Sequence, residues 1–143
     1  MFLFKIYFII INSVFICYSY RIAIVGDVGL NVDARKNLLL IKKEADVLIH
    51  NGDFDYISNP KRWNQFLDET VGKKFPIYAV LGNHELGNNE DDQKLALKYI
   101  QYHKKRMNII QLHCSKDTIY LVKSNCMYKN VQIIQVAIGI RFF

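Results

Sequence analysis

Three short apolar runs in the first part of the chain each end in a glycine followed by polar side chains. The runs lie in the segments RIAIVGD (21–27), DVLIHNGD (46–53) and FPIYAVLGNHE (75–85). A continuous apolar run of this length is typical of a strand covered on both faces, as in a parallel sheet. The pattern therefore predicts three buried strands, each leading into a polar loop.

Helical periodicity fills both intervals between these strands. Residues 32–45 present apolar positions at helical spacing, and Asp33 can cap the helix. Residues 58–72 predict a second helix with Asn59 as the cap, Pro60 in the first turn and Gly72 at the end. The predicted buried positions are Leu38, Leu39, Ile41 and Ala45 in the first helix and Trp63, Phe66, Leu67 and Val71 in the second. The order βαβαβ predicts parallel strands and right-handed crossovers.

The second half of the chain is less regular. Residues 91–107 predict a helix, and residues 118–124 and 131–140 predict strands. The segment between the two strands, NCMYKN at 125–130, predicts a hairpin turn. Together with the first half, this pattern indicates a single layered α/β domain.

The first nineteen residues form a separate segment. Lys5 precedes an apolar stretch from 6 to 16, and small side chains follow at Cys17 and Ser19. This layout is typical of a secretory signal peptide cleaved after Ser19, which predicts a secreted or lumenal domain of residues 20–143. An uncleaved membrane anchor is the alternative, although the stretch is short for a membrane span. In an oxidising compartment Cys114 and Cys126 are expected to form a disulfide, with two buried thiols as the alternative.

Composition adds few constraints. The chain has 143 residues, a net charge of +6 and 51% hydrophobic residues, which fits one globular domain. The densest basic run, residues 103–108, is interpreted as a solvated face, because no nucleic-acid-binding motif accompanies it. The sequence thus predicts neither a nucleic-acid partner nor, after signal cleavage, a membrane partner, and it leaves the oligomeric state open.

The polar loops after the three strands carry the candidate chemistry. The carboxyl ends of neighbouring parallel strands lie at one edge of a sheet, so Asp27, Asp53, Tyr56, Asn83 and His84 are expected to converge. Carboxylate, amide and phenolate oxygens are hard ligands for hard cations. A carboxylate in the middle loop can bridge two ions, which makes Asp53 the expected bridging ligand of a two-metal site.

The set GDVG, GDFDY and GNHE, at this spacing, resembles the calcineurin-like metallophosphoesterases. Gly29 stands where most of that superfamily has histidine, and Tyr56 stands where most have aspartate. Both departures make the chain similar to the purple acid phosphatase branch. The resemblance is close over residues 22–85 and looser through residues 126–139.

The resemblance implies a dinuclear centre that hydrolyses small phosphoric esters by attack of a metal-bound hydroxide. Asp27 and Tyr56 would bind Fe³⁺, Asp53 would bridge, and Asn83 would hold a divalent Fe, Zn or Mn ion. His84 would act as the catalytic residue, steadying the phosphoryl oxygens or protonating the leaving group. Glu85 would not bind the metals and would instead orient His84.

The chain departs from the family in its histidines. The family adds three metal-binding histidines in downstream VxxH-like and GHxH motifs, whereas this chain has four histidines and none in a GHxH context. The sequence is therefore expected to be the first part of a larger phosphoesterase or a degenerate copy, with weak metal binding and little hydrolysis. The alternative is a noncatalytic binding module that keeps the fold.

Several nearby residues have simpler interpretations. Asp55 is expected to be a cap or solvent residue, and His50 a strand-end histidine with its hydrogen bonds satisfied. His103 and His113 are expected at the surface, and Trp63 in the core.

Overall fold

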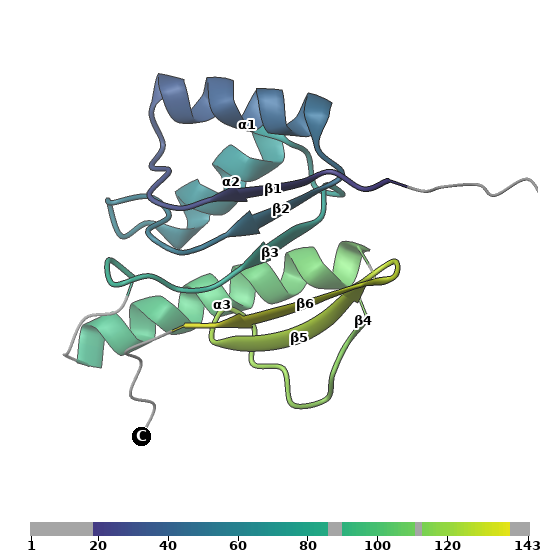
Figure 1. The fold of residues 1–143 in the computed structure, drawn as a ribbon. Helices are drawn as coiled ribbons and strands as arrows, with labels where there is room; N and C mark the ends of the chain where they lie inside the picture. The colour runs from purple at the N-terminus through teal and green to yellow at the C-terminus, as the bar shows by residue number, and fades with distance from the viewer. Residues whose placement is uncertain (1–18, 86–89, 111–112, 138–143) are drawn as a thin grey trace, which may run out of the picture.

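The computed structural model describes residues 19–85, 90–110 and 113–137, and Figure 1 shows how their elements are arranged. Residues 1–18 of the predicted signal peptide and residues 138–140 of the last predicted strand lie outside the described ranges. No helix within the described ranges is long and apolar enough to cross a membrane. The elements are β1 (Ile22–Val25), α1 (Val32–Glu44), β2 (Val47–His50), α2 (Pro60–Thr70), β3 (Ile77–Ala79), α3 (Glu90–Ile110), β4 (His113–Cys114), β5 (Lys123–Tyr128) and β6 (Val131–Val136).

The first sheet is parallel in the order β1-β2-β3, which confirms the predicted βαβαβ unit. In Figure 1, α1 and α2 lie over one side of this sheet and the β4-β5-β6 sheet lies on its other side. The prediction that β1 is covered on both faces was wrong. Ile22 is 39% and Ile24 65% exposed, whereas Ala23 and Val25 pack on the core. The second sheet covers β2 and β3 and leaves this part of β1 open.

The two crossover helices differ in how well the apolar pattern predicted them. Asn31, not Asp33, caps α1, because its side chain accepts a hydrogen bond of 2.8 Å from the Ala34 N–H. Its buried positions are Ala34 and Leu38, while Leu39 is exposed. In α2 the predictions hold: Asn59 is the cap, and Trp63, Phe66, Leu67 and Val71 are buried.

The second sheet is antiparallel in the order β4-β5-β6. The strand predicted at 118–124 was misplaced. Leu121 has a φ of 67°, which breaks the strand conformation, and β5 starts only at Lys123. Most of the segment predicted as a turn is therefore strand, and the chain reverses at Lys129 and Asn130. Inward positions of β5 and β6, such as Cys126 and Ile133, pack against Tyr78 of the first sheet.

An aromatic cluster forms the centre of the core between the first sheet, α2 and α3. Phe54 stacks on Trp63 with ring centroids 4.2 Å apart, and Tyr99 of α3 contacts both rings. His50 meets the edge of the same cluster, 4.9 Å from the Phe54 ring. Because Phe54 directly follows Asp53, this packing fixes the start of the loop that carries the middle motif.

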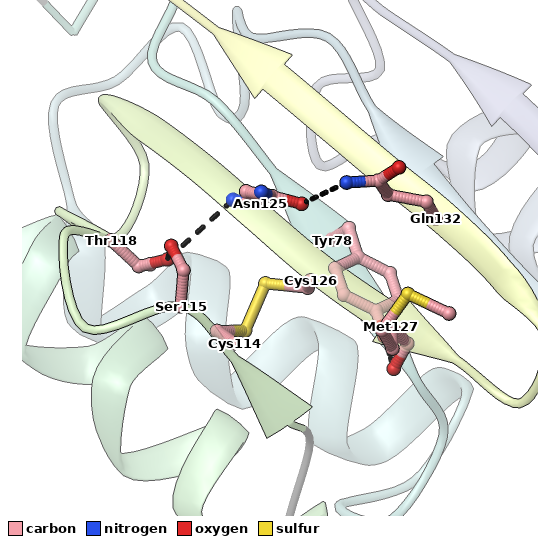
Figure 2. Close-up of a disulfide and its surroundings, with 8 residues drawn as sticks. All are labelled: Tyr78, Cys114, Ser115, Thr118, Asn125, Cys126, Met127 and Gln132. Carbon is pink, nitrogen blue, oxygen red and sulfur yellow. Dashed lines mark hydrogen bonds between the residues drawn. A yellow bond between two sulfur atoms is a disulfide. The ribbon is translucent and has the colours of Figure 1, made fainter.

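The second sheet carries the disulfide shown in Figure 2. Cys114 of β4 and Cys126 of β5 are directly opposed, and their sulfur atoms are bonded. Cys126 is fully buried beside Tyr78, whose hydroxyl donates to the Met127 carbonyl at 3.3 Å. The bond closes a loop of sequence separation 12, so it restricts the unfolded chain as well as joining two strands.

We expect replacement of both Cys114 and Cys126 by serine to lower the free energy of unfolding by about 3 kcal/mol, the value for a loop of this length. Urea unfolding of the variant and of the parent chain measures the difference. Dithiothreitol should bring the parent close to the variant and leave the variant unchanged. A parent chain whose midpoint is insensitive to the reductant would contradict the expectation.

Candidate metal centre

The loops after β1 and β2 leave their strands through left-handed backbone. Asp27, Asp53 and Tyr56 have φ angles of 52°, 55° and 56°. This region is unfavourable for most residues with a side chain, although aspartate tolerates it better than most, and such positions cluster at functional sites. Because the chain turns sharply at these residues, the carboxylates of Asp27 and Asp53 stay at the ends of β1 and β2.

The predicted convergence of the three loops is present in two side-chain contacts and one backbone contact. The Tyr56 hydroxyl donates to Asp27 Oδ1 at 2.7 Å, joining the first and second loops. The backbone N–H of His84 donates to Asp53 Oδ1 at 3.0 Å, joining the second and third. The rings of Tyr56 and His84 lie 4.6 Å apart between their centroids. These four residues therefore lie at one rim, and Asn83 is exposed beside them.

The Asp53 carboxylate lies directly over Gly82, the residue before Asn83. A Cβ built on Gly82 would lie 2.2 Å from Asp53 Oδ1, a distance that excludes any side chain there. Gly82 thus leaves the space that Asp53 occupies, and the GN dipeptide of the third motif has a packing reason in this fold.

Negative charge accumulates at this rim. Among the described residues no ion pair neutralises Asp27 or Asp53. The hydrogen bond to Asp27 raises the pKa of Tyr56 to about 12, with smaller contributions from desolvation and from the charges of Asp27, Asp53 and Glu85. A cation would oppose all of these charge effects, and it would make the Tyr56 phenolate easier to form.

The contacts of Glu85 differ from the predicted ones, in which Glu85 orients His84. Its buried carboxylate accepts backbone N–H bonds from Asp53 at 2.9 Å, Phe54 at 2.7 Å and Gly82 at 2.9 Å. Desolvation raises the pKa of Glu85, while the three N–H bonds oppose that effect. The sequence reasoning missed this contact with two loops, because nothing in the spacing of GNHE shows which way the glutamate points.

Asp55 was expected to be a cap or solvent residue, and the solvent alternative was wrong because its side chain is buried. Its carboxylate accepts N–H bonds from the three residues Ile57, Ser58 and Asn59 and a bond of 2.7 Å from the Tyr99 hydroxyl. It therefore shapes the turn that carries Tyr56 and has its acceptors directed inward.

The remaining histidines differ in their burial. His113 is exposed, as expected. His50 lies at the end of β2, but neither ring nitrogen has a partner among the described residues, so the expectation of satisfied hydrogen bonds was wrong. The expectation that His103 lies at the surface was also wrong, since its side chain is buried under Tyr120. Burial lowers the pKa of His50 to about 4 and that of His103 to about 3.

The donor set fits a hard cation only in part. Asp27, Tyr56 and Asp53 offer carboxylate and phenol oxygens at one rim, which is the chemistry such ions prefer. However, no group of three or more His, Cys, Asp or Glu side chains in the described ranges is placed to hold a metal ion. A site built from the described residues would therefore use Tyr56 or Asn83 beside the carboxylates.

The sequence model of a family described as calcineurin-like phosphoesterase matches residues 20–137, most of the chain. No curated protein and no solved structure matches the chain.

Proposed function

Because the chain belongs to the calcineurin-like phosphoesterase family, we propose that its rim of strand-end residues is a metal-dependent phosphoesterase site. The observation that carries the proposal is the convergence of the three motifs. Two hydrogen bonds, from Tyr56 to Asp27 and from His84 to Asp53, bring residues of GDVG, GDFDY and GNHE to one place. The fold, with β1-β2-β3 parallel, puts these motifs at the edge where open α/β sheets bind ligands.

Within this proposal Asp27 and Tyr56 would hold one ion, Asn83 would hold a second, and the Asp53 carboxylate would contribute to both. When bound, the ions supply Lewis acidity toward the phosphoryl group and toward the attacking water. The hydrogen bond from Tyr56 to Asp27 then has to be exchanged for metal contacts. That exchange favours a strongly Lewis-acidic ion, since the pKa of Tyr56 is raised to about 12 in its present surroundings.

His84 has the exposed position that a residue acting on substrate needs. Its backbone N–H is fixed on Asp53 Oδ1, and its ring lies beside the ring of Tyr56. These contacts hold the imidazole at the rim, where it can donate a hydrogen bond to a phosphoryl oxygen or a proton to a leaving-group oxygen. We therefore assign His84 as the catalytic acid or phosphoryl-binding residue.

The finer assignment is an acid phosphatase of the purple type, with Fe³⁺ and a divalent Fe, Zn or Mn ion. Gly29 and Tyr56 support this branch, and the Cβ position of Gly29 lies 3.8 Å from the Tyr56 ring. We further propose a secreted or lumenal location for the domain, which the Cys114–Cys126 bond supports because disulfides are common in oxidising compartments. The substrate would be a small phosphorylated molecule.

A noncatalytic module is the second candidate. The chain supplies Asp27, Asp53, Tyr56 and Asn83 but lacks the GHxH motif, and no trio of His, Cys, Asp or Glu side chains is placed for a metal in the described ranges. With so few ligands each ion is held by at most about three protein atoms, which predicts weak metal binding and slow turnover.

Metal titration with turnover measurement tests both candidates. We expect the chain to bind Fe³⁺ with a visible Tyr–Fe³⁺ charge-transfer band, and to bind Mn²⁺ or Zn²⁺ by calorimetry. With Fe³⁺ and Zn²⁺ it should hydrolyse p-nitrophenyl phosphate slowly but above the rate of the metals alone. Binding of metal and inorganic phosphate with no turnover would favour the noncatalytic module.

Two aspartate variants test the assignment. One replaces a proposed metal ligand, and the other is a control at an exposed position. Asp53→Asn should abolish metal binding and turnover, whereas Asp33→Asn changes an exposed residue in the first turn of α1 and should leave both unchanged. Metal affinity that is equal in the parent and Asp53→Asn would contradict the proposed site.

A further inference from the structure

A buried carboxylate lies beneath the candidate site and contacts two of its loops. Glu85 is 1% exposed. Its Oε1 accepts from the Phe54 N–H, and its Oε2 accepts from both the Asp53 N–H and the Gly82 N–H. One side chain thus satisfies N–H groups that belong to the loop after β2 and to the loop after β3.

The two loops approach each other more closely at this point than side chains would allow. A Cβ on Gly52 would lie 2.5 Å from the Cα and N atoms of Gly82, and a Cβ on Gly82 would lie 2.5 Å from the Asp53 N atom. Backbone packed against backbone leaves three N–H groups facing inward with no strand partner. A buried N–H group without an acceptor is unfavourable, and the Glu85 carboxylate accepts all three.

We infer that Glu85 is a positioning residue, which sets the separation of Asp53 from Asn83 and His84 by holding both loop backbones. The inference rests on the proposed function, because the geometry it fixes is that of the proposed metal-bridging carboxylate and its neighbours. Above Glu85 the described residues of the two loops also meet in the bond from the His84 N–H to Asp53 Oδ1 and in the contact of the Tyr56 and His84 rings, and a bound cation would weaken the bond by drawing on the same oxygen.

Asp55 shows what an ordinary structural carboxylate looks like in the same region. It is also buried, and it also accepts three backbone N–H bonds. All three donors follow it within one turn, so its loss would loosen that turn without changing the distance between the loops after β2 and β3. The two carboxylates differ in what they join, and this difference makes Asp55 the matched control.

The variant Glu85→Gln keeps the shape of the side chain and removes one acceptor oxygen. Whichever way the amide is turned, its NH₂ group faces at least one of the three N–H donors. We expect faster hydrogen exchange at the Gly82 and His84 amides of the metal-free chain, measured by NMR. Affinity for Mn²⁺, measured by calorimetry, should fall about 10-fold or more, as for other residues that support metal ligands.

Asp55→Asn should destabilise the chain to a similar extent, and it should accelerate exchange at Ile57 and Ser58 while the Gly82 and His84 amides stay protected. The inference is overturned if Glu85→Gln leaves the Gly82 and His84 amides protected, or if it alters them without weakening Mn²⁺ binding relative to the exposed-site control Asp33→Asn. A parent chain that binds no Mn²⁺ would instead overturn the proposed function, and the amide exchange would still decide whether Glu85 holds the loops.

Discussion

Replacing Gly52 by alanine is expected to cost about 4 kcal/mol of folding free energy, a large fraction of the total stability of about 5 to 15 kcal/mol that is typical of a domain. Two effects add at this position. Its φ of 85° is a conformation that residues with a side chain rarely adopt, and the new Cβ would lie 2.5 Å from the Gly82 backbone. Relief of the clash requires the loops after β2 and β3 to separate, so we also expect metal binding to be lost in any folded fraction.

Gly72 separates these two effects. Its φ of 93° is just as unusual for alanine, but nothing lies within 4 Å of its Cβ position. Gly72→Ala should therefore show only the backbone cost of about 1 to 2 kcal/mol. Urea unfolding of both variants measures the difference. Equal losses of stability at the two positions would mean that the approach of Gly52 to Gly82 is not a tight constraint.

The second large effect is expected on acidification. Burial lowers the pKa of His50 to about 4 and that of His103 to about 3, from an ordinary value near 6.5. The unfolded chain therefore binds protons at both sites below pH 6.5 while the folded chain does not. Stability should fall steadily from pH 6.5 toward pH 4, by on the order of 3 kcal/mol for each histidine.

Neighbouring charges modify this loss without reversing it. Asp27 favours the charged form of His50, whereas Arg106 and His50 disfavour that of His103. The raised pKa of Glu85 acts in the opposite sense, since its protonation favours the folded chain as the pH falls. Thermal unfolding at several pH values measures the sum. His113→Gln, at an exposed position, should not alter the profile, and a midpoint that is constant from pH 6.5 to pH 4.5 would contradict the expectation.

The first half of the fold could be predicted because local and global preferences agree there. Asn59, Pro60 and the stripe at Trp63 specify α2 by capping and periodicity alone, and glycine ends each apolar run at a strand end. The exposure of Ile24 could not be predicted in this way. An apolar run indicates a strand, but how much of its second face is covered depends on where a distant sheet packs.

The second half was less predictable because its conformation depends on contacts distant in sequence. Leu121 fits a strand by propensity, yet it adopts a left-handed φ where its carbonyl accepts from the Leu81 N–H at 2.7 Å. His103 lies in a polar, basic run of α3, and it is buried because Tyr120, in the segment before β5, packs against its ring. One turn later Met107 packs in a cluster with Cys126 and Ile133 of the second sheet. Neither effect leaves a signal in the local pattern.

At the candidate site the sequence predicted which loops meet, since parallel strands present their carboxyl ends together. The contacts of Tyr56 with Asp27 and of His84 with Asp53 agree with that expectation. The sequence did not predict the direction of the Glu85 side chain. Whether a carboxylate points at a neighbouring ring or under the backbone is decided by the close approach of Gly52 and Gly82, which no spacing encodes.

The stacking of Phe54 on Trp63 gives the chain an optical reporter of its own. Trp63 is the single tryptophan, it is 2% exposed, and its stacking partner is the residue after Asp53. Any movement of the loop after β2 therefore changes the surroundings of the indole, and the wavelength and intensity of its fluorescence will follow. Emission from the unlabelled protein can thus be recorded during metal addition, acid titration or unfolding.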